Sequence, residues 1–187
     1  MGEACGLELT TAEPSAPPGG ELDLVLTVTN RVRGHALPTG STFIRQMWLE
    51  VVATDADGRV LYETGTLDAA GDLRNHWSGL DAYGDPDLVT FGSAFVDARG
   101  APELFPWRAA EVTSTALSPG YPRTVTLFVP VPSDVKGPIA VNARVRFRTH
   151  PPFLLRALGL DALVAKVQTY DMASAAVSVP LSGVAPQ

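Results

Sequence analysis

Three histidines are the residues of this sequence best suited to binding a metal, because imidazole is a common ligand of metals and of haem iron at neutral pH. His35 lies in an expected loop after a strand, His150 follows a later strand, and His76 lies in an irregular segment. One end of a β-sandwich could bring His35 and His150 together. With Met47 or Met172 they would then form a mononuclear copper site. The alternative is that each imidazole bonds backbone groups of its own loop.

A row of three arginines, Arg144, Arg146 and Arg148, alternates with apolar residues in one predicted strand. The two-residue period of a strand places all three on one face, over about 13 Å. Like charges in a row need partners. One hypothesis pairs these arginines with Glu21 and Asp23 across strands. The other is recognition of carboxylates, such as haem propionates or an acidic partner surface.

Three aromatic residues outside any strand pattern, Trp77, Tyr83 and Trp107, are candidates for an exposed binding surface. Sugars stack on aromatic faces, so a carbohydrate-binding or cell-surface adhesion module is one alternative function. For contacts with a protein partner, the candidates are Arg45, Trp77 and Trp107.

The sequence patterns contain no recognisable catalytic machinery. The single cysteine, Cys5, excludes an internal disulfide and a thiolate metal cage, and we expect it in a frayed terminus. No Gly-x-Ser-x-Gly elbow, phosphate-binding loop or carboxylate pair stands out. The chain has no Cys-x-x-Cys-His motif for the covalent attachment of a c-type haem. We therefore predict a protein that is not an enzyme and carries no covalently bound cofactor.

The overall charge argues against nucleic acid as a partner. The 187 residues include 14 Lys and Arg against 20 Asp and Glu, a net charge of −6. No apolar run approaches the ~18 residues of a membrane-spanning helix. The first ten residues carry no signal peptide. We expect either a cytoplasmic protein or a domain cut from a longer exported one, and the Met1-Gly2 start favours the second.

The elements that must position the candidate residues are mostly strands, separated by turns rich in Gly and Pro. Residues 1–20 are expected to be a linker or edge segment, and 21–187 a single domain with an irregular excursion at 65–110. One helix is expected at 153–166, although Gly159 weakens its middle. The predicted strands are 21–30, 44–54, 60–64, a short one near 88–91, 111–117, 121–129, 139–148 and 173–181.

Seven to eight short strands with such turns predict an all-β fold. The architecture that fits best is an antiparallel β-sandwich of immunoglobulin-like or fibronectin-like type, with one long irregular insertion and one short helix. The Cys-Trp-Cys core of a true immunoglobulin domain is absent. Sandwiches serve many functions, so the fold alone does not identify this one.

The stretch at 34–40, GHALPTG, resembles the GHxxPTG signature at the head of the C-terminal β-domain of bacterial multihaem c-type cytochromes. The likeness continues in order from about residue 20 to 160, and the haem-bearing half that precedes this domain in that family is missing here. The later pieces that carry it are Arg45, 48–51 (WLEV), 54–61 (TDADGRVL), 106–109 (PWRA), 118–120 (SPG) before Arg123, and 143–148 (ARVRFR).

This resemblance implies a non-catalytic accessory or docking domain of an extracytoplasmic electron-transfer protein, in the periplasm or outside the cell. The haem would be supplied by another domain or chain, which would also be the partner. The resemblance further implies that His35 approaches a haem or packs beside one. It implies that Arg144, Arg146 and Arg148 face propionates or a neighbouring subunit, with Arg45 and the His35 loop contacting the haem-bearing partner.

Overall fold

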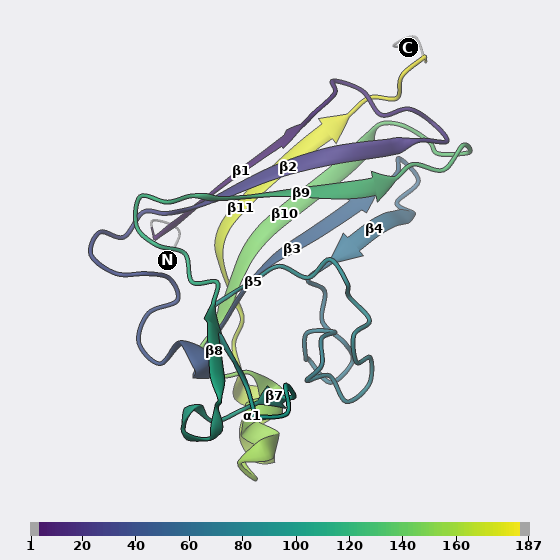
Figure 1. Cartoon of the computed structure of the whole chain (residues 1–187). Helices are drawn as coiled ribbons and strands as arrows, with labels where there is room; N and C mark the ends of the chain where they lie inside the picture. Colours follow the sequence, from purple (N-terminus) through teal and green to yellow (C-terminus); the bar gives the residue numbers. More distant parts are fainter. Residues whose placement is uncertain (1–3, 184–187) are drawn as a thin grey trace.

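Two antiparallel sheets pack face to face in the computed structural model, which describes residues 4–183 (Figure 1). The first sheet has the order β1-β2-β9, with β1 at Cys5–Thr11, β2 at Glu21–Asn30 and β9 at Arg123–Pro130. The bounds of β2 are those predicted from its alternating pattern. β1 is an edge strand inside the segment 1–20.

The second sheet has the order β11-β10-β3-β4. Its strands are β11 at Tyr170–Val179, β10 at Ile139–Arg148, β3 at Gln46–Thr54 and β4 at Val60–Thr64. The short β5 at Thr90–Phe91 also pairs with β3. β10 has a partner strand on each side, β11 along 139–147 and β3 along 140–148, as expected for the strand with the clearest alternation.

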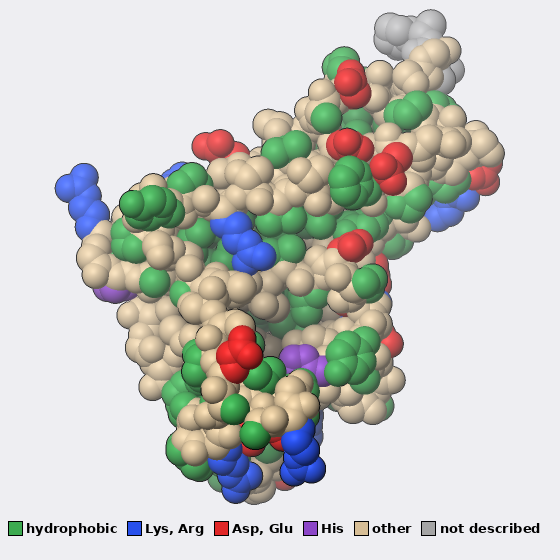
Figure 2. Space-filling view, viewed as in Figure 1, with side chains coloured by type: hydrophobic (Ala, Val, Ile, Leu, Met, Phe, Trp, Pro, Cys, Tyr) green, Lys and Arg blue, Asp and Glu red, His purple; other side chains and the backbone are tan. Residues whose placement is uncertain are grey.

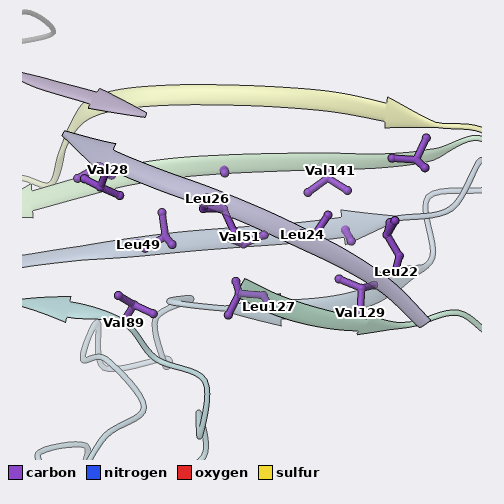
Figure 3. Packing of buried hydrophobic residues seen from close by; sticks show 14 of the residues in the cluster. Leu22, Leu24, Leu26, Val28, Leu49, Val51, Val89, Leu127, Val129 and Val141 are labelled. Atoms are coloured by element: carbon purple, nitrogen blue, oxygen red, sulfur yellow. The ribbon is translucent and has the colours of Figure 1, made fainter. Parts of the chain in front are cut away.

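The core lies between the two sheets and is built from the inward-facing residue of every second position (Figure 3). Burying these side chains removes apolar surface from water, which is the main favourable term in folding. The residues labelled in Figure 3 come from β2, β3, β9, β10 and the segment before β5: Leu22, Leu24, Leu26, Val28, Leu49, Val51, Val89, Leu127, Val129 and Val141.

A third, small sheet has the order β7-β6-β8, with β6 at Ser93–Val96, β7 at Pro102–Glu103 and β8 at Glu111–Ser114. The predicted all-β fold is confirmed, with eleven strands in the part of the chain that the structure describes. The prediction of seven to eight strands missed β1, β6 and β7. The last two lie inside the excursion and are too short to show a period.

The predicted helix 153–166 is wrong in its length. The α-helix α1 covers Pro152–Ala157 only, and a 3-10 segment, η3, follows at Asp161–Lys166. Between them Gly159 has φ +70°, a left-handed conformation that ends the helix. Among the described residues no helix is long and apolar enough to cross a membrane.

The expectation that Cys5 lies in a frayed terminus is also wrong. Cys5 begins β1 and is 1% exposed, as part of the core. Burial raises the pKa of its thiol to about 11, although the nearby positive charge of Arg31 acts in the opposite direction. A thiol in this state is a packing residue and a poor nucleophile.

The first half of the excursion covers the outer face of the second sheet. Trp48, on that face, is fully buried and donates its indole N–H to the carbonyl of Gly65 at 2.8 Å. Asp85 is buried and accepts hydrogen bonds from the hydroxyl of Thr64 at 2.8 Å and the amide of Gly65 at 2.6 Å. These bonds attach an irregular segment to a regular one, as expected of a long segment inside a compact domain.

Candidate functional site

The loop between β2 and β3 carries His35 on a backbone that Asn30 holds in place. Asn30 is buried, and its side-chain amide donates to the carbonyls of His35 and Leu117, both at 2.9 Å. Its Oδ1 accepts from the amide of Val32 at 2.9 Å. One amide side chain supplies two donors and an acceptor, so Asn30 meets all three backbone groups. The loop is thereby attached to the segment between β8 and β9.

Leu37 adds a second attachment between the same two segments. Leu37 and Leu117 exchange two backbone hydrogen bonds, of 3.0 and 2.7 Å. The side chain of His35 itself is exposed, with Nδ1 3.3 Å from the carbonyl of Ala36. This contact fits the alternative that the imidazole bonds its own loop, and it leaves Nε2 without a hydrogen bond among the described residues. The result is an accessible imidazole on an anchored backbone.

The other two histidines lie elsewhere. His150 is exposed just before α1, and His76 is half-buried, with its ring centroid 4.7 Å from that of Trp77. Burial lowers the pKa of His76. In the described part of the chain no three His, Cys, Asp or Glu side chains are grouped to hold a metal. Met47 and Met172, the methionines predicted as further copper ligands, are both packed in the core. The copper site stays a hypothesis.

Two of the three arginines bind carboxylates of their own sheet. Glu50, on β3, is buried and accepts hydrogen bonds from Arg144 Nε at 3.0 Å and Arg146 Nη1 at 2.6 Å. Asp171, on β11, accepts from the same two residues at 3.3 and 3.1 Å. The hydrogen bond to Glu50 raises the pKa of Arg144. The positive charges of this pair are therefore matched inside the sheet.

The predicted partners of the arginines, Glu21 and Asp23, are wrong because both lie on β2 in the other sheet. The register places Glu50 directly opposite Arg144. A signal for this pairing exists in the sequence: Glu50 is the only charged residue within Gln46–Thr54. A carboxylate inside an otherwise apolar strand needs a cation on the neighbouring strand.

Arg148 has a different environment. It is 1% exposed, and no carboxylate of the described residues pairs with it. Its Nε donates to Gln46 Oε1 and its Nη1 to the carbonyl of Gly71, both at 2.6 Å, and its guanidinium lies 5.2 Å from the centroid of the Trp48 ring. Burial, and then the charge of Arg146, lowers its pKa to about 10. Arg148 fastens the excursion to the sheet at a depth that a propionate would not reach.

A hollow of about 190 Å³ lies where η1 (Thr42–Ile44), the β5–β6 segment, the excursion and α1 meet. Arg45, predicted to bind a partner, is one of its lining residues. Trp77 lines it too and is stacked on Phe153, with 4.9 Å between centroids and 7° between ring planes. The residues with rings that surround it are Phe43, His76, Trp77, Phe91, Phe95 and Phe153. We call this space the aromatic hollow.

Trp107 is separate from the aromatic hollow. It lies in a 3-10 turn, η2 at Pro106–Arg108, is 74% exposed, and is stacked on Phe105 at 4.8 Å. On the face seen in Figure 2, several Asp and Glu side chains lie over the upper sheets, and Lys and Arg side chains lie at the lower end. Tyr83, the third aromatic candidate, is 71% exposed. The carbohydrate-binding alternative stays a hypothesis, with Trp107 and Tyr83 as its exposed rings.

Comparison with known proteins gives a structural likeness. No family model and no curated protein sequence matches the chain. Among solved structures, a penta-heme cytochrome c552 from Thermochromatium tepidum matches with a TM-score of 0.66 and 19% identity, over 94% of this chain and 40% of that one. Spo0M, a sporulation control protein from Bacillus subtilis, reaches a TM-score of only 0.37 at 10% identity, over 97% of this chain and 50% of that one.

The likeness to the cytochrome shows the fold: this chain has the architecture of a part that makes up 40% of that chain's length. The likeness to Spo0M is too weak to support any conclusion. A domain of this architecture therefore forms part of a penta-heme cytochrome c552.

Asn30, the last residue of β2, holds the His35 loop, and the sequence pattern did not single it out. A signal was present: Leu22, Leu24, Leu26 and Val28 are buried in alternation, and Asn30 continues the same series. A polar residue on the core face of a strand has to be hydrogen-bonded. The nearby loop is the place where those bonds are made.

Proposed function

We propose that this chain is a non-catalytic accessory β-domain that docks on the haem-bearing part of an extracytoplasmic multihaem cytochrome. The observation that supports this most directly is the likeness to part of a penta-heme cytochrome c552, at a TM-score of 0.66 over 94% of the chain. The haem belongs to the partner polypeptide, either another domain of the same protein or another subunit. The working location is the periplasm or the outside of the cell.

His35 is the residue that we assign to contact with the partner's haem. Its imidazole is exposed, with Nε2 free of hydrogen bonds within the described residues, while Asn30 and Leu37 fix its backbone. Such an arrangement presents a side chain at little cost in conformational entropy on binding, because the loop is already ordered. The haem would supply the redox chemistry, and this chain would supply a fixed polar contact at its edge.

Arg144 and Arg146 are less suited to this contact than their sequence pattern implied. Both are already paired with Glu50 and Asp171, and a propionate would have to displace one of these carboxylates. Propionate binding by these two arginines stays a prediction. The docking surface proposed here instead uses the His35 loop, which has no such internal competitor.

The experiment is a binding and absorption measurement with the haem-bearing polypeptide that accompanies this domain. Wild type, His35→Ala and His150→Ala are each added to it, and association and the Soret band are recorded. His150 is a matched control, since it is also an exposed histidine at the end of a strand. We expect association with wild type and His150→Ala, and weaker association with a shifted Soret band for His35→Ala.

Two outcomes would contradict the proposal at different levels. If wild type does not associate with the haem-bearing polypeptide, the docking function is wrong. If His35→Ala associates as wild type does and leaves the Soret band unchanged, His35 is removed from the interface. Glycan-array screening and metal analysis of protein purified without chelator test the carbohydrate and copper alternatives on the same samples.

A further inference from the structure

We propose that the aromatic hollow is a binding site for a flat aromatic group that carries a carboxylate, and that Arg45 binds the carboxylate. The hollow lies beside α1 and the small sheet, and Arg144 and Arg146 do not line it. Three features of its lining support the inference: the rings of its wall, its unpaired donors and its size.

The wall of the hollow is apolar and comes from segments that are far apart in the sequence. Phe43 belongs to η1, Phe91 and Phe95 to β5 and β6, Trp77 to the excursion and Phe153 to α1. Aromatic rings prefer offset-stacked or edge-to-face neighbours, so a wall of this kind favours a flat ring as its occupant. Ligand sites in proteins commonly combine such a wall with a few polar groups.

Three polar side chains of the lining have donors that no described residue uses. Arg45 is half-buried and its guanidinium makes no hydrogen bond or ion pair with residues 4–183. Gln46 uses its Oε1 to accept from Arg148, which leaves its NH₂ group free. Asn75 uses its Oδ1 to accept from the backbone amide of Trp77, which again leaves NH₂ free.

These free donors can bind a ligand that carries hydrogen-bond acceptors. A carboxylate fits them because it accepts up to four hydrogen bonds and pairs with a guanidinium through two parallel bonds. The lining includes one carboxylate, that of Glu103, which already accepts from the amides of Leu104 at 2.7 Å and Phe105 at 3.0 Å. Both amides bond Oε1 of Glu103, and this carboxylate forms no hydrogen bond or ion pair with Arg45 among the described residues.

The size of the hollow limits the occupant. An apolar cavity of about 150 Å³ holds a single benzene ring. At about 190 Å³, the hollow holds one ring with a short carboxylate arm. A whole porphyrin is too large, and only its rim with one propionate would enter.

Two sources provide this chemistry: a free aromatic acid, and the propionate-bearing rim of a haem carried by a partner. The second source rests on the proposed function, and the first does not. The test with a free acid needs no partner polypeptide. Its failure would therefore be distinct from a failure of the docking experiment.

The experiment is a titration of the whole chain with phenylacetate, followed by NMR chemical shifts and by tryptophan fluorescence, to which Trp77 contributes together with Trp48 and Trp107. The neutral control ligand is phenylacetamide, which has the same ring and no charge. We expect a Kd on the order of 1 mM for phenylacetate. Arg45→Met should weaken it by about tenfold or more, because a hydrogen bond to a charged group is lost. Arg45→Lys should recover part of the affinity, since lysine keeps the positive charge but cannot make the two parallel hydrogen bonds of a guanidinium.

Arg99→Met is the matched control variant, since the side chain of Arg99 is 91% exposed and lies outside the hollow. Circular dichroism of each variant establishes that it is folded. Protoporphyrin IX and its dimethyl ester then separate the two sources. If protoporphyrin IX binds and Arg45→Met weakens that binding, the occupant is the rim of a haem. If protoporphyrin IX does not bind, the occupant is a free aromatic acid.

The inference is overturned if phenylacetate does not bind, or if phenylacetamide binds equally well. It is also overturned if folded Arg45→Met binds phenylacetate as tightly as wild type and Arg99→Met do. Chemical shifts confined to residues outside the hollow would likewise exclude this site.

Discussion

Replacing Asn30 by alanine should both destabilise the protein and release the His35 loop. The side chain of Asn30 makes three hydrogen bonds of 2.9 Å, to the carbonyls of His35 and Leu117 and from the amide of Val32. Alanine can make none of them. The carbonyl of Leu117 keeps its bond from Leu37, whereas the bond to the His35 carbonyl has no replacement among the described residues.

The size of the effect follows from these bonds. Each hydrogen bond contributes about 0.5–1.5 kcal/mol net, so the loss of three lowers the free energy of unfolding by about 2–4 kcal/mol. Asn30→Asp should cost at least as much. It keeps the acceptor for Val32 but places a negative charge against the two carbonyl oxygens.

Urea unfolding followed by circular dichroism measures the change, with Asn142→Ala as the control. Asn142 is an exposed asparagine on β10, and that substitution should change stability by less than about 0.5 kcal/mol. In the docking experiment, folded Asn30→Ala should associate more weakly than wild type even though His35 is intact. If Asn30→Ala is as stable as Asn142→Ala, the side chain does not hold the loop as described.

Three further predictions concern other parts of the chain. Glu50→Gln should lower the free energy of unfolding by about 2–3 kcal/mol in urea titrations. This is less than the 3–5 kcal/mol of a fully buried pair, because the side chains of Arg144 and Arg146 are 43% and 18% exposed. The control Glu8→Gln, at an exposed site, should have little effect, and equal effects of the two variants would contradict the stabilising role of the ion pairs that Glu50 makes with Arg144 and Arg146. Burial lowers the pKa of His76, so the unfolded state binds its proton more readily and stability should fall as the pH drops below about 6.5. His76→Gln should reduce that slope between pH 7 and 5, and an unchanged slope would rule out His76 as its source. The thiol of Cys5, with its pKa raised to about 11 by burial, should react with a thiol reagent such as Ellman's only when urea unfolds the chain, and rapid labelling of the native protein would refute its burial.

The alternating strands were the most predictable part of the fold. β2 and β10 have the bounds expected from their patterns, because a strand with one buried face records that face in every second residue. β4 has the bounds expected of the hairpin partner that follows the turn at 55–58. The short β6 and β7 were missed since two to four residues cannot show a period. The helix after β10 was predicted too long, because a left-handed Gly159 ends it and the residues beyond form a 3-10 segment.

For the site, the sequence identified residues and the fold decided their surroundings. His35 was selected by its loop and by the GHALPTG stretch, and the structure leaves it exposed. The three arginines share one face, as a period of two requires. Their partners were not predictable, because strand order decides which neighbour lies across from each of them, and β10 pairs with β3 and β11 instead of β2.

The sequence by itself determined the class of the fold, the strand that carries the arginines and the loop that carries the histidine, since these follow from local periodicity and turn chemistry. Only the tertiary structure decided that Arg148 is buried, that Asn30 fastens the loop to Leu117, and that Arg45 faces a wall of rings. Each of these contacts joins segments far apart in the chain. Their formation depends on the packing of whole sheets, which a single local pattern does not record.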